Sequence, residues 1–89
     1  MSERTVTIVN QLGLHARAAA KLVTLAAKFK SEIRVKKDAK EVSGKSMMGV
    51  LMLAAARGSV LKLSAEGPDA DKALEAIEAL IARKFDEPA

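Results

Sequence analysis

Apolar and polar residues alternate in three stretches of the chain, as in a strand with one buried and one solvent-exposed face. These stretches are residues 5–9 (TVTIV), 32–35 (EIRV) and 59–65 (SVLKLSA). Their buried faces would carry Val6, Ile8, Leu61, Leu63 and Ala65. Residues 10–13 (NQLG) break the first strand, and Gly13 can adopt a positive φ. Residues 37–40 (KDAK) predict a turn into a further short strand at 41–43.

Three other stretches have apolar residues spaced by three and four positions, as on one face of a helix. The first helix is expected from Ala16 to about Lys28. Ser46 precedes a short apolar helix that should stop near Arg57 and Gly58, because glycine is favoured just after a helix. Residues 67–69 (GPD) open the last helix. The predicted apolar stripes are Ala19, Leu22, Val23, Ala26 and Ala27 in the first helix, and Ala70, Ala73, Leu74, Ile77, Leu80 and Ile81 in the last.

The predicted order of elements is strand, helix, strand, strand, helix, strand, helix. Alternation within the strands implies a sheet with one covered and one wetted face, which is typical of an antiparallel sheet with helices on one side. We therefore expect an α+β fold, an open-faced β-sandwich, in a single domain spanning residues 1–89. Residues 85–89 are expected to form a frayed C-terminal tail.

The composition narrows the class of protein. With 49% hydrophobic and 29% charged residues, the chain has the balance of a globular domain. It has no cysteine, which excludes disulfides and thiolate metal sites. Its start (MSERTVTIV) lacks the pattern of a secretory signal, and the apolar residues 47–56 are too few to cross a bilayer. We therefore expect a cytoplasmic protein without membrane insertion.

The charge favours acidic partners. Fifteen Lys and Arg against eleven Asp and Glu give a formal net charge of +4, which attracts acidic proteins or phosphate-bearing ligands. A nucleic-acid-binding role is an alternative, but Phe29 and Phe85 are the only aromatic residues and the basic residues are dispersed. One histidine, scattered acidic residues and glycines without phosphate-loop spacing predict neither a metal nor a cofactor.

The only histidine, His15, lies within GLHARAAAKLV (residues 13–23), at the predicted junction of a turn and a helix. In one interpretation it is a modest N-cap or a solvent-facing residue. In the other it receives a phosphoryl group, because the free amides of Ala16, Arg17 and Ala18 point toward an anion held there. The Arg17 guanidinium can donate two hydrogen bonds to phosphate oxygens. Without an evident base, metal or water-positioning residue, such a site would hold a phosphoryl group and pass it on unhydrolysed.

Two motifs together resemble a known family. GLHARAAAKLV and, about thirty residues later, GKSMMGVL are similar to the HPr family, the histidine-containing phosphocarriers of the bacterial phosphoenolpyruvate-dependent phosphotransferase system. The resemblance runs from about residue 4 to residue 84 and implies the strand order 1-4-2-3 with three helices on one face. It also implies that His15 accepts phosphate on Nδ1 from enzyme I, that Arg17 contacts the phosphate, and that IIA-type proteins receive it. The protein would then be a phosphoryl carrier and not an enzyme.

The same resemblance gives Ser46 two interpretations. Ser46 matches a serine that an HPr kinase/phosphorylase modifies in many bacteria, and it is also an ordinary N-cap for the short helix. Met47, Met48 and Leu51 fall where the family presents an apolar docking patch, although methionines at helical spacing are more often part of a core. A carrier that docks on two partners in turn is expected to be a monomer.

One residue departs from the family pattern. Ala18 stands where the family usually has proline, a residue that would fix φ in the first helical turn. Relatives with alanine or serine here resemble proteobacterial HPr proteins and the nitrogen-related paralogue NPr. The sequence therefore leaves two circuits open, sugar uptake and a regulatory relay without transport.

Overall fold

Four strands form one antiparallel sheet in the computed structural model of the chain, which describes residues 1–87. The strands are β1 (Ser2–Thr7), β2 (Glu32–Lys37), β3 (Lys40–Ser43) and β4 (Val60–Glu66). The helices are α1 (Ala16–Ala26), α2 (Met47–Met52) and α3 (Ala70–Ala82), and a 3₁₀ turn, η1 (Lys84–Asp86), follows α3. The sheet order is β1-β4-β2-β3, so the first and last strands are neighbours. This order confirms the one implied by the family resemblance.

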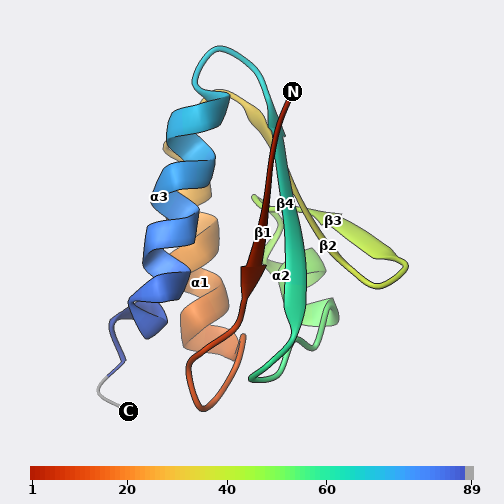
Figure 1. Cartoon of the computed structure of the whole chain (residues 1–89), viewed down its shortest axis with the longest axis vertical. Helices are drawn as coiled ribbons and strands as arrows, with labels where there is room; N and C mark the ends of the chain where they lie inside the picture. Colours follow the sequence, from red (N-terminus) through yellow and green to blue (C-terminus); the bar gives the residue numbers. More distant parts are fainter. Residues whose placement is uncertain (88–89) are drawn as a thin grey trace.

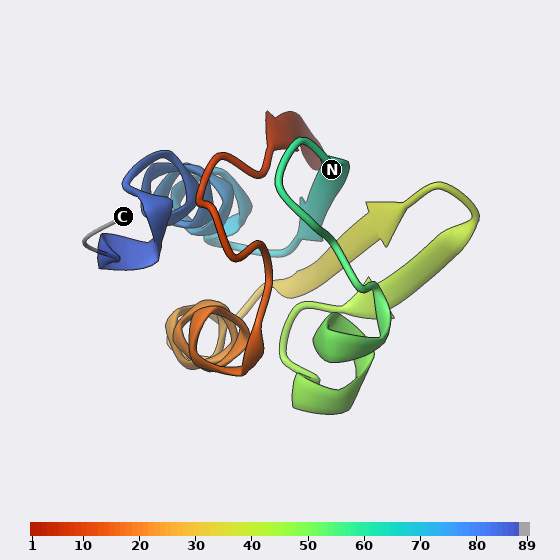
Figure 2. The same cartoon turned by 90° about the horizontal axis from the view of Figure 1, so that it is seen from below.

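The three helices lie on the same face of the sheet, and its other face is open (Figures 1 and 2). The α+β open-faced sandwich predicted from strand alternation is therefore confirmed. In the register of the sheet, Val6 lies opposite Leu61, and Leu63 lies opposite Val35. Across residues 1–87, no helix combines the length and the apolar character needed to cross a membrane.

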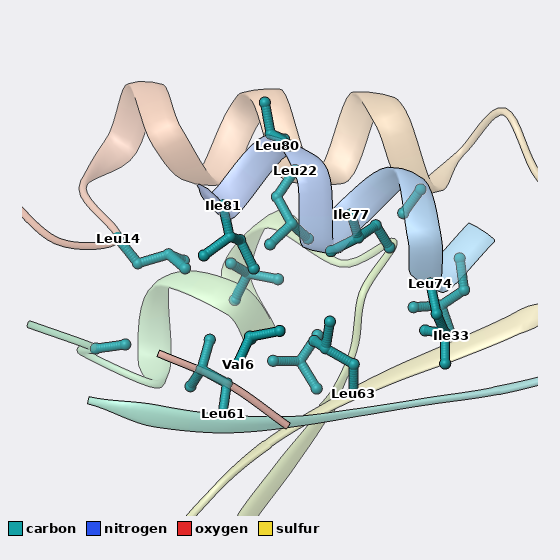
Figure 3. Close-up of a cluster of buried hydrophobic side chains, with 14 of the residues drawn as sticks. Val6, Leu14, Leu22, Ile33, Leu61, Leu63, Leu74, Ile77, Leu80 and Ile81 are labelled. Atoms are coloured by element: carbon teal, nitrogen blue, oxygen red, sulfur yellow. The ribbon is translucent and has the colours of Figure 1, made fainter. Parts of the chain in front are cut away.

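One hydrophobic core fills the space between the helices and the covered face of the sheet (Figure 3). The strands contribute alternate residues, and the helices contribute the stripe spaced by three and four positions, as the sequence predicts. Leu14 also points into the core from the loop before α1 (Figure 3). The largest fully buried side chains are Phe85, Ile8, Leu22, Ile33, Leu53, Leu61, Leu63, Leu74, Ile77, Ile81, Val35 and Val50.

Two elements of the N-terminal half have different boundaries from those that the sequence predicts. Alternation predicts the first strand at 5–9, whereas β1 spans Ser2–Thr7 because it is aligned with β4, with Ser2 opposite Ala65 and Thr7 opposite Val60. The first helix ends at Ala26, not near Lys28, because the amides of the next turn bond carbonyls only three residues back. Ala27, which the sequence places on the apolar stripe, is exposed, and Ala18, which it does not, is buried.

The prediction that the second helix stops near Arg57 and Gly58 is wrong. Helix α2 ends at Met52, and Ala54 has a positive φ of 51° at which the chain turns away. The ammonium groups of Lys37 and Lys40 donate hydrogen bonds to carbonyls at this helix end. Gly58, with φ 91°, belongs to the turn before β4 and does not cap the helix. Residues 53–59 form a loop instead.

The expectation of a frayed tail over residues 85–89 is corrected for residues 85–87. The Phe85 side chain is fully buried, and η1 is closed by the bonds Asp86 N–H to Arg83 O and Glu87 N–H to Lys84 O. Burying a phenylalanine contributes about 1.5–3 kcal/mol, which is enough to hold a short segment against the domain. Residues 88–89 lie outside the described part of the chain.

Candidate functional site

Helix α1 starts at the end of the molecule where the loops after β1 and α2 and the C-terminal end of α3 also lie (Figure 1), and His15 is the residue just before this helix. The loop before His15 is held by the loop after α2, because the Leu14 amide donates a hydrogen bond to the Ala55 carbonyl at 2.8 Å. Gly13 has φ 66°, and a Cβ there would lie 2.6 Å from the same carbonyl oxygen. The turn therefore requires glycine, which confirms the positive φ expected at this position.

His15 is the N-cap of α1, and the capping hydrogen bond orients its ring. Its backbone is extended, with φ −75° and ψ 178°, and its Nδ1 accepts a hydrogen bond from the Arg17 amide at 3.3 Å. An atom that accepts from an N–H group carries a lone pair and no proton. Within residues 1–87 the amides of Ala16 and Ala18 have no hydrogen-bond partner. Nδ1 thus faces free donors at the positive end of the helix, as the phosphoryl interpretation requires.

The other ring nitrogen faces a carboxylate. His15 Nε2 lies 2.9 Å from Glu87 Oε1, and the two side chains are 28% and 11% exposed. Because Nδ1 is an acceptor, Nε2 carries the proton and donates it to Glu87. This hydrogen bond lowers the pKa of the Glu87 carboxyl below its ordinary value, although burial of the carboxyl opposes the effect. The contact therefore fixes one tautomer of the ring.

Asn10 joins Glu87 to the loop before His15. Its amide nitrogen donates to Glu87 Oε1 at 2.6 Å and to the Gly13 carbonyl at 2.7 Å, and its side chain is fully buried. A carboxylate and a carbonyl both accept, so this orientation of the amide is the one that chemistry permits. Asn10 is therefore part of the support around His15.

The C-terminal segment delivers Glu87 through an unusual turn. Lys84, Phe85 and Asp86 have φ of 59°, 56° and 60°, a left-handed conformation that is unfavourable for residues other than glycine. Burial of Phe85 and a 2.6 Å hydrogen bond from Lys21 Nζ to the Phe85 carbonyl hold the turn against this cost. No pattern in the sequence points to Glu87 or Asn10 as part of the site. The one available signal was an aromatic residue placed just beyond the last helix.

The Arg17 side chain is free to meet a ligand. Its guanidinium has no hydrogen bond or ion pair in the part of the chain that the structure describes, and the residue is exposed. It lines an open groove between α1 and the end of α3, together with Lys21, Lys28 and Arg83. These four cationic side chains outnumber the one acidic side chain that lines the groove, Asp86, so the groove has a positive field that attracts phosphate and acidic surfaces.

Ser46 is the N-cap of α2. Its hydroxyl oxygen accepts a hydrogen bond from the Gly49 amide at 3.1 Å, which confirms the N-cap interpretation. Among the proposed docking residues, Met48 is 71% exposed, whereas Met47 and Leu51 are half-buried against the core. The sequence did not single out Leu12 and Met52, which are also exposed, at 68% and 64%.

The described residues hold no cluster of three or more His, Cys, Asp or Glu side chains that could bind a metal ion. His15 offers an imidazole nitrogen with a lone pair, with hydrogen-bond donors around it and the exposed Arg17 side chain two residues away. Such a group can form a bond to an electrophilic phosphorus.

The chain is similar to known proteins over nearly its whole length. Residues 2–83 match the family described as "PTS HPr component phosphorylation site". The chain is 49% identical to phosphocarrier protein HPr of Cupriavidus necator, over 98% of both chains. It is 52% identical to phosphocarrier protein NPr of Shewanella violacea, over 96% of this chain and 93% of the relative. A crystal structure of HPr from Thermoanaerobacter tengcongensis superimposes with a TM-score of 0.96, at 49% identity and complete coverage of both chains. The chain belongs to the HPr family of phosphocarrier proteins of the phosphotransferase system.

Proposed function

We propose that the protein accepts a phosphoryl group on His15 Nδ1 from phosphorylated enzyme I and donates it to IIA-type proteins of the sugar phosphotransferase system. The observation that carries the proposal is the state of the ring, in which Nδ1 is an unprotonated acceptor beside the free amides of α1. Family membership supports the same assignment.

The transfer step balances in atoms and electrons with His15 and the phosphoryl donor alone. The Nδ1 lone pair attacks phosphorus, the bond between phosphorus and the donor breaks, and its electron pair returns to the donor. The proton on Nε2 stays in place. The amides of Ala16, Arg17 and Ala18 and the Arg17 guanidinium then face the phosphoryl oxygens and stabilise their negative charge.

The site also supports transfer to a second protein instead of to water. The carboxylate next to the ring, Glu87, lies on the Nε2 side and not beside Nδ1, so it is poorly placed to activate water against the phosphoryl group. The protein acts as a carrier that is modified during each cycle and has no small substrate of its own.

Docking is proposed on the surface around His15. Met47, Met48 and Leu51 provide an apolar contact, and the cationic groove by α1 attracts acidic partners. Phosphorylation of Ser46 by an HPr kinase/phosphorylase would place a charge beside this contact. The protein is proposed to act in the cytoplasm as a monomer, which sedimentation can check.

A regulatory relay without sugar transport is a second candidate, because the chain is as similar to an NPr as to an HPr. In that role the phosphorylation state of His15 would control partner proteins. Phosphoryl transfer to a sugar-type and to a nitrogen-type IIA protein, measured side by side at equal concentrations, separates the two candidates.

The proposal is tested by incubating the protein with phosphoenolpyruvate and enzyme I and mapping the phosphate. We expect one acid-labile, base-stable phosphate on His15, and none in His15→Ala. A label that remains in His15→Ala, or a wild type that is never labelled by an active enzyme I, would contradict the proposal.

A further inference from the structure

We propose that Glu87 is a positioning residue for phosphoryl transfer at His15. Its carboxylate holds the proton on Nε2 and stabilises the positive charge that the ring acquires when Nδ1 bonds to phosphorus. This inference rests on the proposed function, and it assigns a role to the C-terminal segment that neither the sequence motifs nor the family match covers, since the match ends at residue 83.

The two ring nitrogens are held by opposite kinds of partner. Nδ1 accepts from the Arg17 amide at 3.3 Å, and Nε2 lies 2.9 Å from Glu87 Oε1. A ring turned by 180° about Cβ–Cγ would place carbon atoms against both partners. The other tautomer would set an N–H on Nδ1 against the Arg17 amide and a lone pair on Nε2 against the Glu87 carboxylate, so both bonds would be lost in either case. The Glu87 carboxylate therefore selects the one arrangement in which Nδ1 is ready to attack.

Charge balance gives Glu87 a second effect during the reaction. Before transfer, the ring is neutral, with one proton on Nε2. When the Nδ1 lone pair forms the bond to phosphorus, that proton remains and the ring becomes cationic. The hydrogen bond to Glu87 then joins a cation to a carboxylate and is stronger than before transfer. An interaction that strengthens along the reaction lowers its barrier.

The contacts around Glu87 hold its carboxylate in place beside His15. The same oxygen accepts from Asn10 at 2.6 Å, and the carboxylate is only 11% exposed. Two residues before it, Phe85 is buried in the core and its carbonyl accepts from Lys21 of α1. The segment is thus attached to the loop before His15, to the core and to α1.

A purely structural role is the competing explanation, in which Glu87 only ties the segment down. Glu87→Gln separates the two, because the amide oxygen still accepts from His15 Nε2 and from Asn10 but carries no charge. A tether would survive this change. Stabilisation of a cationic ring would not.

The experiment compares the wild type with Glu87→Gln, Glu87→Ala and a matched control, Glu75→Gln, which neutralises an exposed carboxylate of α3. Nitrogen-15 NMR of the His15 side chain in the free protein reports the ring proton and its exchange with water. Steady-state transfer from enzyme I gives the maximal rate and the enzyme I concentration at half that rate. Melting temperatures check that each variant is folded.

For Glu87→Gln we expect the Nε2 proton to stay protected and docking to be unchanged, while the maximal rate falls by about three- to tenfold. For Glu87→Ala we expect the Nε2 proton to exchange faster and the rate to fall about tenfold or more. Glu75→Gln should behave as the wild type. A Glu87→Gln protein that transfers at the wild-type rate overturns the proposal, whatever Glu87→Ala does.

The design also separates this inference from the proposed function. If the wild type takes no phosphate on His15, the proposed function fails, and the reaction part of this inference fails with it. If the wild type is phosphorylated on His15 but all variants match it in rate and ring signals, only the role of Glu87 is refuted. The NMR comparison needs no partner protein, so the contact is tested in either case.

Discussion

At the scale of single residues, the site depends on giving the two nitrogens of one imidazole different surroundings. Nδ1 faces the amides at the start of α1, and Nε2 faces Glu87. Arg17 contributes through two separate groups. Its amide orients the ring, and its guanidinium is unengaged in residues 1–87, so only the side chain can be changed without disturbing the ring.

Arg17→Ala should slow phosphoryl transfer about tenfold while leaving the melting temperature nearly unchanged, because the side chain is exposed and, in the proposed function, its guanidinium contacts the phosphate. Arg17→Lys should recover only part of the rate, since an ammonium cannot form the planar fork of two hydrogen bonds. Transfer kinetics with enzyme I and thermal unfolding of the three proteins check this. Equal rates for all three would show that the guanidinium has no role.

The sequence identifies some of these residues and not others. His15 and Arg17 lie two positions apart, so helix-capping rules and the free amides of a first turn are enough to propose them as a phosphate site. Glu87 is 72 residues from His15 and meets it only because of the path of the C-terminal segment. That path depends on burial of Phe85 and on three left-handed residues, neither of which a periodic pattern reveals.

At the scale of elements, the starts of the helices carry most of the chemistry. His15 caps α1 and Ser46 caps α2, and both accept from the backbone of the helix they precede. Asp69 precedes α3 but accepts from Lys30 and Ser31, so it joins this helix to the turn before β2.

Ser46→Ala should lower the free energy of unfolding by about 1 kcal/mol, because it loses the bond to the Gly49 amide. Ser46→Asp should unfold close to the wild type, since an aspartate also caps a helix and its charge suits the positive end. Its affinity for enzyme I should fall about tenfold or more, because the charge lies next to the exposed Met48. Urea unfolding and binding isotherms measure the two effects separately.

An aspartate variant that docks as tightly as the wild type would contradict the proposed docking surface. An aspartate variant with a free energy of unfolding well below that of Ser46→Ala would contradict the description of the cap.

Asp69 should make the fold sensitive to acid. The Ser31 hydroxyl, followed by the Lys30 amide, lowers the pKa of the Asp69 carboxyl from 3.8 to about 2. A pKa that is lower in the folded than in the unfolded protein contributes stability above the unfolded value, and this stability is lost as the pH falls from about 4 toward 2. Asp69→Asn should therefore be less stable than the wild type at neutral pH and lose less stability across this window.

Melting temperatures between pH 2 and pH 7 test this prediction, with Glu75→Gln as the control for loss of one carboxylate. Parallel curves for Asp69→Asn and the wild type below pH 4 would refute it.

Elements could be predicted from the sequence better than their ends. Three of the four strands and the long stripe of α3 follow from spacing, because alternation and the helical period each satisfy burial in only one way, and the short strand β3 follows from the turn before it. The end of α2 does not, since the apolar run continues to Ala56. Contacts from Lys37 and Lys40 end the helix and release residues 53–59 to hold the loop before His15.

At the scale of the whole molecule, the site is built at one end of the fold. Helices cover one face of the sheet, the loops at one end build the site, and the C-terminal segment closes against that end (Figures 1 and 2). Phe85 attaches this segment to the hydrophobic core, so a change that detaches the segment should also remove Glu87 from His15.

Phe85→Ala should lower the free energy of unfolding by about 3–5 kcal/mol, because it empties a fully buried site. It should also release Glu87 and so speed exchange of the Nε2 proton of His15. Leu12→Ala, at a residue that is 68% exposed, should change stability by no more than about 0.5 kcal/mol. Urea unfolding measures both, and a Phe85→Ala protein within 1 kcal/mol of the wild type would restore the frayed tail that the sequence predicts.

In the proposed function, Nδ1 of His15 bonds to phosphorus while Nε2 keeps its proton. The most direct test is nitrogen-15 and phosphorus-31 NMR of the protein phosphorylated by enzyme I with phosphoenolpyruvate. We expect Nδ1 to couple to phosphorus and Nε2 to carry a proton that exchanges slowly with water. Phosphorus bound to Nε2, with the proton on Nδ1, would contradict it.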